Sequence, residues 1–199
     1  MKKILYSALT LILGLVLSSS GCNTMDAVDP DGIKIGDLIW AKYNVGAPGT
    51  FASTPESPGM FYKWNINIGW SASDPIQSFP SLATWSSTYS TATKWEAGNN
   101  PCPDGWRVHT QSDFGKLLTA SQGWDAVKKG REYGSGTNTI FLPAAGSRSS
   151  ALGNVGTNGY YWMSDAYNDS YACVFLFVNN VQNISNQLKY LGNTIRCVK

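Results

Sequence analysis

Charged side chains are scarce in this chain of 199 residues, at 14% of the total against about 25% in an average globular protein. Intrinsic disorder requires high net charge and few aromatic residues, whereas this chain holds eight Trp, ten Tyr and seven Phe. The sequence therefore predicts a folded protein, and its length suits one ordinary domain with a short appendage.

An excess of basic residues and a set of metal ligands are also missing. Without residues 1–21, which include Lys2 and Lys3, 13 basic side chains face 13 acidic ones. Binding to phosphates needs a cluster of Lys and Arg, so we expect no nucleic-acid partner. With His109 as the single histidine and no Cys-x-x-Cys pair, we expect no metal, no cofactor and no enzymatic activity.

No apolar run is long enough to span a bilayer. The run from Ile4 to Leu17 follows Lys2 and Lys3 and has about 14 residues, fewer than the roughly 20 that a spanning helix requires. It is typical of the apolar core of a secretory signal peptide, expected over residues 1–21.

The small residues 18–21 lead directly to Cys22, in a pattern that resembles a bacterial lipobox. Lipidation of Cys22 would anchor the protein to a membrane, with polar residues 22–34 as a tether. We therefore expect the cell envelope, either the outer membrane or the cell surface. Ordinary secretion, with Cys22 as an incidental thiol, is the alternative.

Export to an oxidising compartment favours a disulfide among the remaining cysteines. Cys102 lies in the turn-rich segment 100–106 and Cys197 near the end of an apolar strand, whereas Cys173 lies within a strongly apolar run. We predict a bond between Cys102 and Cys197, with Cys173 as a buried free thiol. On the chain-entropy model, the closed loop of about 95 residues stabilises the fold by a few kcal/mol.

A helical signal in the middle of the chain, with antiparallel strands expected around it, predicts an α+β fold. Thr110 and Asp113 are typical of a helix cap, and Phe114, Leu117 and Leu118 share one helical face. A shorter turn is expected over 124–129, and residues 65–100 are expected to form a loop with little regular structure. The expected strands cover 37–41, 60–64, 139–143, 160–162, 172–178 and 194–198.

Three segments resemble the Fibrobacter succinogenes major paralogous domain, a family common in exported lipoproteins of gut Bacteroidetes. They are IGDLIWA at 35–41 with NVG at 44–46, NPCPDGWRV at 100–108, and the C-terminal pattern from Tyr161 to IRCVK at 195–199. The family usually has Pro where His109 stands. The resemblance implies a C-type-lectin-like domain over residues 35–199, with small antiparallel sheets, one or two short helices and long loops.

The last forty residues further resemble the variable region of diversity-generating retroelement targets. The matching residues include YWMS at 161–164, AYN at 166–168 and GNTIRCV at 192–198, and residues 154–199 hold eight of the fifteen Asn. In such proteins adenine-derived codons are varied while a fixed scaffold presents a ligand-binding face. The resemblance implies such a face at the C-terminus of this chain.

The apolar run 172–178 permits two interpretations. In a strand Cys173 and its alternate neighbours point to one side, whereas Val174, Leu176 and Val178 point to the other. Both faces could be buried in a central strand, or the Val174 face could be an exposed apolar patch for a partner.

The segment 179–191 has many amides and no helical or strand period, which is also typical of a solvated loop. The functional interpretation is a paratope-like surface, in which Tyr and apolar side chains supply contact area and Asn supplies hydrogen bonds. The candidate ligand-binding residues are Asp165, Tyr167, Asn168, Asp169, Tyr171, Val174, Leu176, Val178, Asn180, Ile184, Asn186, Leu188, Tyr190 and Leu191.

The C-terminal region offers only Asp165 and Asp169 to a Ca²⁺ ion, which needs six to eight oxygen ligands. His109 is expected to be structural, and apolar surroundings would raise rather than lower the pKa of the Cys173 thiol. We therefore expect non-covalent binding of a protein or glycan ligand at a host or bacterial surface. The alternative is an adhesin, or a pilus-tip or assembly subunit, of fixed specificity.

Overall fold

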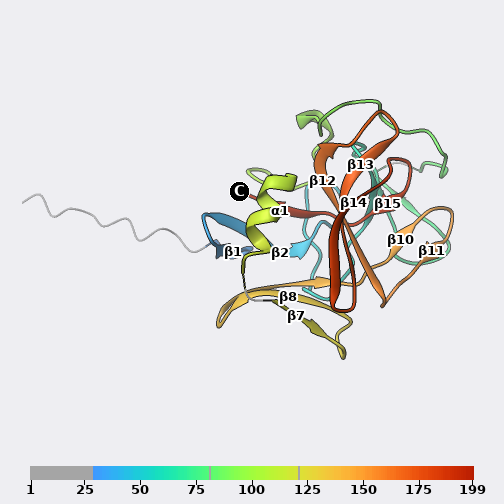
Figure 1. Cartoon of the computed structure of the whole chain (residues 1–199). Helices are drawn as coiled ribbons and strands as arrows, with labels where there is room; N and C mark the ends of the chain where they lie inside the picture. The colour runs from blue at the N-terminus through green and yellow to red at the C-terminus, as the bar shows by residue number, and fades with distance from the viewer. Residues whose placement is uncertain (1–28, 81, 121) are drawn as a thin grey trace, which may run out of the picture.

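The computed structural model describes residues 29–80, 82–120 and 122–199 and shows strands throughout these ranges, with one α-helix (Figure 1). The helical elements are α1 (Gln111–Leu117) and the 3-10 turn η1 (Ala97–Asn99). The strands are β1 (Gly32–Ile35), β2 (Leu38–Asn44), β3 (Phe61–Lys63), β4 (Gly69–Trp70), β5 (Ser78–Phe79), β6 (Arg107–Val108), β7 (Gln122–Asp125), β8 (Gly130–Ser135), β9 (Asn138–Pro143), β10 (Ser147–Arg148), β11 (Leu152–Gly153), β12 (Asn158–Ala166), β13 (Tyr171–Val178), β14 (Val181–Leu188), β15 (Gly192–Asn193) and β16 (Arg196–Val198).

The strands form four antiparallel sheets, with the orders β1-β2-β16-β6, β11-β10-β15-β3-β4-β5, β12-β13-β14 and β7-β8-β9. The predicted α+β, C-type-lectin-like fold with one or two short helices is therefore wrong. Strands make up 44% and helices 6% of the described residues, which is a mostly β architecture.

The physical reason lies in residues 119–135 and 179–191. The helical signal at Thr110 is real, because Thr110 and Asp113 form a capping box, but the helix ends at Leu117. The chain then turns back through the β7–β8 and β8–β9 hairpins. Two-residue turns after β8 and β13, at Gly136 (φ +58°) and Asn179 (φ +49°), create strands that carry little apolar alternation of their own.

Two of the hydrophobic clusters lie on opposite faces of the sheet β12-β13-β14. Phe175 and Tyr161 belong to the first cluster, with Phe114 from α1. Val174 and Trp162 belong to the second, which also contains the Cys102–Cys197 disulfide. The predicted disulfide is thereby confirmed, and Cys173 is a buried free thiol.

The first two strands of the domain and its last strand belong to one sheet. Ile39 of β2 and Lys199 exchange two backbone hydrogen bonds of 3.0 Å, and β16 lies between β2 and β6. β1 begins at Gly32, within the segment expected as a tether. The expected signal peptide, Cys22 and the first part of the tether lie outside the described residues. No helix in the described ranges is long and apolar enough to cross a membrane.

Candidate binding site at the β12–β13 turn

The turn between β12 and β13 presents two exposed tyrosines. Tyr167 is 64% and Tyr171 37% exposed. Asn168 folds the turn: its Oδ1 accepts hydrogen bonds from the backbone N–H groups of Ser170 (3.0 Å) and Tyr171 (2.8 Å). Asn168 therefore shapes the backbone, while Asp169 is exposed beside the tyrosines.

A distant loop is fixed against this turn. The Trp95 N–H donates to the Ser164 carbonyl at 2.9 Å, and the Ala166 N–H donates to the Thr93 carbonyl at 3.3 Å. Lys189 Nζ donates to the Ala92 carbonyl at 2.8 Å. These contacts give residues 92–95, in the upper loops of Figure 1, a defined place beside the end of β12.

The same loop adds a third tyrosine. Tyr89 is 36% exposed, and its hydroxyl lies 3.1 Å from Ser170 Oγ. We call Tyr89, Tyr167 and Tyr171, with the exposed Asp169 between the last two, the tyrosine surface. Tyr89 was not among the predicted site residues, because it lies 81 positions before Ser170 and in a loop without any periodicity.

β13 and β14 form a continuous hairpin, from Tyr171↔Leu188 to Val178↔Val181. Of the Val174 face, Val174 is fully buried, Leu176 is half-buried and only Val178, at the far end, is exposed. The middle of β13 is therefore buried on both faces, as in the first interpretation of run 172–178. Only the end of the Val174 face is exposed, as in the second interpretation. Val181, at 73% exposure, extends this apolar tip and was not predicted.

The remaining predicted residues are dispersed over the hairpin and its surroundings. Asn180 and Asn186 are exposed, while Leu188, Tyr190 and Leu191 are half-buried. Ile184 points to the opposite face from Val174 and packs against the first hydrophobic cluster. The segment 179–191, expected as a loop or a paratope, is thus mostly the strand β14. The structure does not bring all the candidates into one surface.

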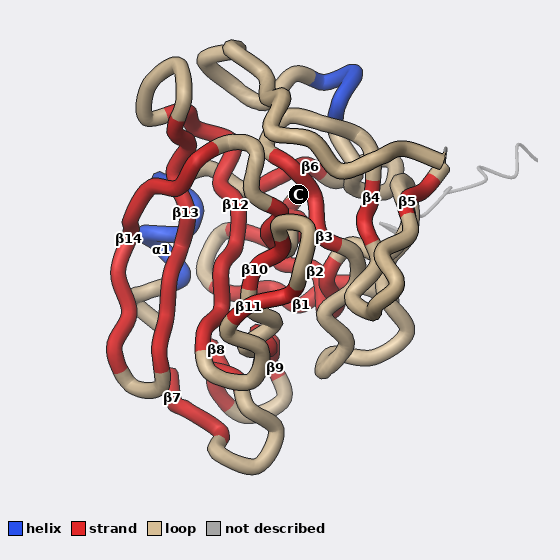
Figure 2. The backbone as a smooth tube through the Cα atoms, turned by 90° about the vertical axis from the view of Figure 1, so that its right-hand side faces the viewer, coloured by secondary structure: helices blue, strands red, loops and turns tan. Residues whose placement is uncertain are grey.

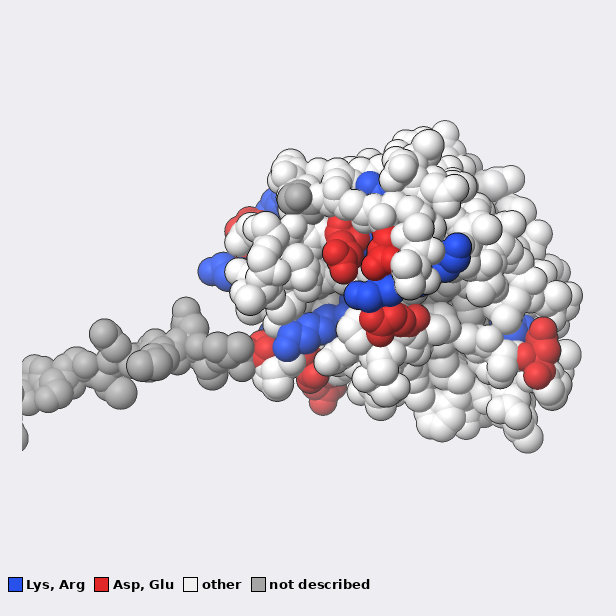
Figure 3. Space-filling model, turned by 90° about the horizontal axis from the view of Figure 1, so that it is seen from below, with Lys and Arg blue, Asp and Glu red and all other residues white. Residues whose placement is uncertain are grey.

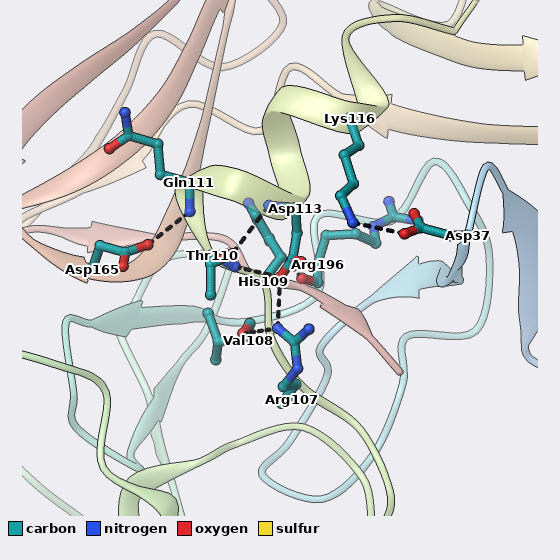
Figure 4. Close-up of polar contacts among 10 residues, drawn as sticks. All are labelled: Asp37, Arg107, Val108, His109, Thr110, Gln111, Asp113, Lys116, Asp165 and Arg196. Atoms are coloured by element: carbon teal, nitrogen blue, oxygen red, sulfur yellow. Dashed lines mark hydrogen bonds and ion pairs between the residues drawn. The ribbon is translucent and has the colours of Figure 1, made fainter.

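Asp165 fastens the helix to the sheet. Its Oδ2 accepts a hydrogen bond of 2.7 Å from the Gln111 N–H at the first residue of α1 (Figure 4). Behind it lies an open hollow in which the Cys173 thiol donates a long hydrogen bond, 3.6 Å, to Gln111 Oε1. The hollow is lined by Gln111, Ser112, Gly115, Asp165, Ala166, Tyr167, Cys173 and Ile184.

No family model, no curated protein and no solved structure matches this chain. The two resemblances based on sequence motifs therefore stay predictions.

His109 lies in an enclosed, largely aromatic environment. His109 is fully buried against Trp40 and Phe114, and its Nδ1 donates to the Arg196 carbonyl at 2.8 Å (Figure 4). Burial lowers its pKa from 6.5 to about 4, although the hydrogen bond to Arg196 opposes this shift. The imidazole is therefore neutral and inaccessible at pH 7, as a structural residue would be.

The carboxylate nearest to this histidine on α1 is also structural. Burial raises the pKa of Asp113, but hydrogen bonds from Arg107 and Thr110 outweigh it and lower the pKa to about 2. Arg107 Nη1 lies 2.6 Å from Asp113 Oδ2. Asp113 is thus a fixed anion that caps α1.

The neighbouring thiol is equally unsuited to nucleophilic catalysis. Burial, with a contribution from the Asp165 carboxylate, raises the pKa of Cys173. A thiol in such surroundings stays protonated and is a weak nucleophile. Among the described residues, no three or more His, Cys, Asp or Glu side chains come together as a metal site.

Charged groups gather elsewhere, on the face seen from below (Figure 3). One hollow of the surface is lined by Lys42, Glu56, Lys128 and Glu132, and Lys128 lies 3.7 Å from Glu132 and 4.0 Å from Glu56. These half-exposed pairs neutralise one another and are worth little individually. They give no field of one sign that would attract a charged ligand.

Proposed function

We propose that this protein is an exported, lipid-anchored surface protein that binds a protein or glycan ligand non-covalently through the tyrosine surface. The observation that carries the proposal is the gathering of three exposed tyrosines, Tyr89, Tyr167 and Tyr171, around one turn whose backbone is fixed by hydrogen bonds.

Tyrosine suits such a role physically. Its ring offers a large contact area, and its hydroxyl accepts or donates a hydrogen bond. Because the side chain has only two torsions, little conformational entropy is lost on binding. The Asp169 carboxylate and the Ser170 hydroxyl add polar contacts beside the rings. A turn already held in place by the Asn168 amide further reduces the cost of ordering on binding.

Export and anchoring are supported by the N-terminal sequence and by the disulfide. The Lys2–Leu17 pattern and the small residues before Cys22 are typical of a lipoprotein signal. The Cys102–Cys197 bond is of the kind that persists in oxidising compartments outside the cytosol. A lipid on Cys22 would leave the domain free to face a ligand beyond the membrane.

Binding of the full chain to host epithelial cells, bacterial cells and immobilised glycans tests the proposal. The double variant Tyr167→Ala/Tyr171→Ala should bind at least about tenfold more weakly, since buried tyrosines each contribute about 1 kcal/mol or more at an interface. The matched control is Phe79→Ala on β5, an aromatic side chain with 46% exposure on the other side of the molecule (Figure 2). Equal loss in both variants, or in neither, would contradict the proposal.

A fixed-specificity assembly subunit is the second candidate, favoured by the apolar hairpin tip at Val178 and Val181. Such a role predicts stable copurification with another envelope protein, lost in Val178→Ser/Val181→Ser and retained in the tyrosine variant. The opposite pattern supports recognition through the tyrosine surface.

We also propose that the 3′ end of the gene is diversified, because the C-terminal motifs resemble those of retroelement targets and this region holds many Asn residues. Deep sequencing across a cell population should then find substitutions at exposed positions such as Tyr167, Asp169, Tyr171 and Asn180. Buried Val174 should be spared. A uniform sequence would favour a receptor of fixed specificity.

A further inference from the structure

Strand β14 forms one edge of the sheet β12-β13-β14. It pairs with β13 along all eight of its residues without a bulge, and within the described ranges no other strand pairs with its far side. Figure 2 shows β14 at the outer margin of the molecule. Successive residues of an antiparallel strand direct their N–H and C=O groups to alternate sides, so about half of the β14 backbone groups face outward.

This edge lacks the features that normally prevent strand pairing. Natural edge strands are protected by charged side chains, by proline, by bulges or by short length. The β14 sequence, VQNISNQL, contains no charged residue and no proline, and its register with β13 is regular. The next residue, Lys189, is buried, and its ammonium group donates a hydrogen bond to the Ala92 carbonyl. Its charge therefore does not protect the edge from pairing with another strand.

The hairpin that carries the edge is fixed in place. Near its tip, Arg131 Nη1 donates to the Asn179 carbonyl at 2.7 Å and Tyr133 Oη donates to Gln182 Oε1 at 2.6 Å. Both donors come from β8, a strand of the neighbouring sheet. A partner strand would therefore meet a preformed edge that needs no ordering before it pairs.

We propose that β14 pairs antiparallel with β14 of a second copy of this chain, about a two-fold axis, to form one continuous six-stranded sheet. Residues that face each other across an antiparallel pair lie on the same side of the sheet. Self-pairing therefore places amides, hydroxyls and aliphatic side chains of β14 opposite one another and brings no like charges together in any register. A charged strand would find no counter-charge on β14, whereas a second copy is neutral and matches the edge in length.

The size of the contact sets its strength. Eight residues at about 3.4 Å each give an edge of about 27 Å, with up to about eight intermolecular backbone hydrogen bonds. One strand width buries less than the roughly 1,600 Å² of a standard interface. The dimer is therefore reversible and forms at high local concentration, as among copies anchored on one membrane.

Sedimentation velocity over a series of protein concentrations tests the proposal. The series extends to about 1 mM, because weak specific dimers still form at this concentration. The protein is the full chain with Cys22→Ser, which removes the predicted lipid attachment. Two exposed positions of β14 carry the test charges, in Asn183→Lys/Asn186→Lys and in Asn183→Glu/Asn186→Glu. Val127→Lys/Val155→Lys, at exposed sites away from β14, is the control for added charge.

The protein with unmodified β14 should dimerise. Each β14 double variant alone should be monomeric, and an equimolar mixture of the lysine and glutamate variants should form dimers again. The control should dimerise as the unmodified strand does. Thermal unfolding checks that the variants are folded. A monomer at all concentrations, or a lysine variant that dimerises like the control, would overturn the proposal. An equimolar mixture that stays monomeric would also overturn the proposal, because opposite charges on two paired β14 strands should attract each other.

Discussion

Acid should destabilise this protein through the buried imidazole of His109. His109 has no exposed surface and lies against Trp40, Phe114 and the Arg196 carbonyl. The Asp113 and Asp165 carboxylates favour its protonation, but burial outweighs them. Burial holds its pKa at about 4, against 6.5 in the unfolded chain. Because the folded pKa is depressed, the unfolded state binds the extra proton between pH 6.5 and pH 4, and stability falls as the pH is lowered through this window.

The magnitude follows from the two values. One pKa unit corresponds to 1.36 kcal/mol, so His109 alone should remove about 2 kcal/mol between pH 7 and pH 5 and about 3 kcal/mol by pH 4. Asp113, with a pKa lowered to about 2, contributes stability that is present above the ordinary aspartate value of 3.8 and is lost below it. The two groups therefore act in separate pH windows.

Urea unfolding followed by tryptophan fluorescence at pH 7, 6, 5 and 4.5 measures this loss. His109→Asn retains an amide donor for the Arg196 carbonyl but cannot titrate, so its free energy of unfolding should stay nearly constant from pH 7 to 5. Constant stability of the unmodified protein over this range would show that the folded pKa of His109 is not depressed. An equal loss in His109→Asn would contradict the prediction too, because the titrating group would then be another one.

Two further predictions concern the disulfide and a close contact in the central sheet. The double variant Cys102→Ser/Cys197→Ser should lower the free energy of unfolding by about 3–5 kcal/mol, because it opens a loop of 95 residues; a change below about 1 kcal/mol in urea unfolding would contradict this. Gly159→Ala would place a Cβ 2.2 Å from the ring of buried Phe177 and should destabilise by about 1–3 kcal/mol. Gly153→Ala is the control, because a Cβ at this position has no atom within 4 Å. Equal shifts of the melting temperature in both variants would contradict the prediction.

The sequence predicts elements well where a local signal decides the structure. The cap at Thr110 gives α1, and the apolar runs 139–143 and 172–178 fall within β9 and β13. The Cys102–Cys197 pairing also follows from the residues, because Cys173 belongs to a strand buried on both faces over most of its length.

Strands that are formed by their partners leave little local signal. β14 is rich in amides and pairs because the two-residue turn at Asn179 returns it along apolar β13. β8 depends in the same way on the turn at Gly136. The turns at Gly136 and Asn179, and not an apolar period, therefore decide where β8 and β14 form.

The site was predicted in part. Tyr167 and Tyr171 are exposed together, but Asn168 serves the turn and Val174 the core. Tyr89 reaches the site through a loop contact that spans 81 residues, and no pattern in a single sequence reports such a contact.

Hydroxyl-radical footprinting tests the binding role of the tyrosine surface most directly, with the protein free and bound to whichever cell or glycan retains it. Our account predicts that Tyr89, Tyr167 and Tyr171 lose reactivity on binding while exposed Phe79 keeps it. Protection of Phe79 or of another face, with the three tyrosines still reactive, would contradict the account.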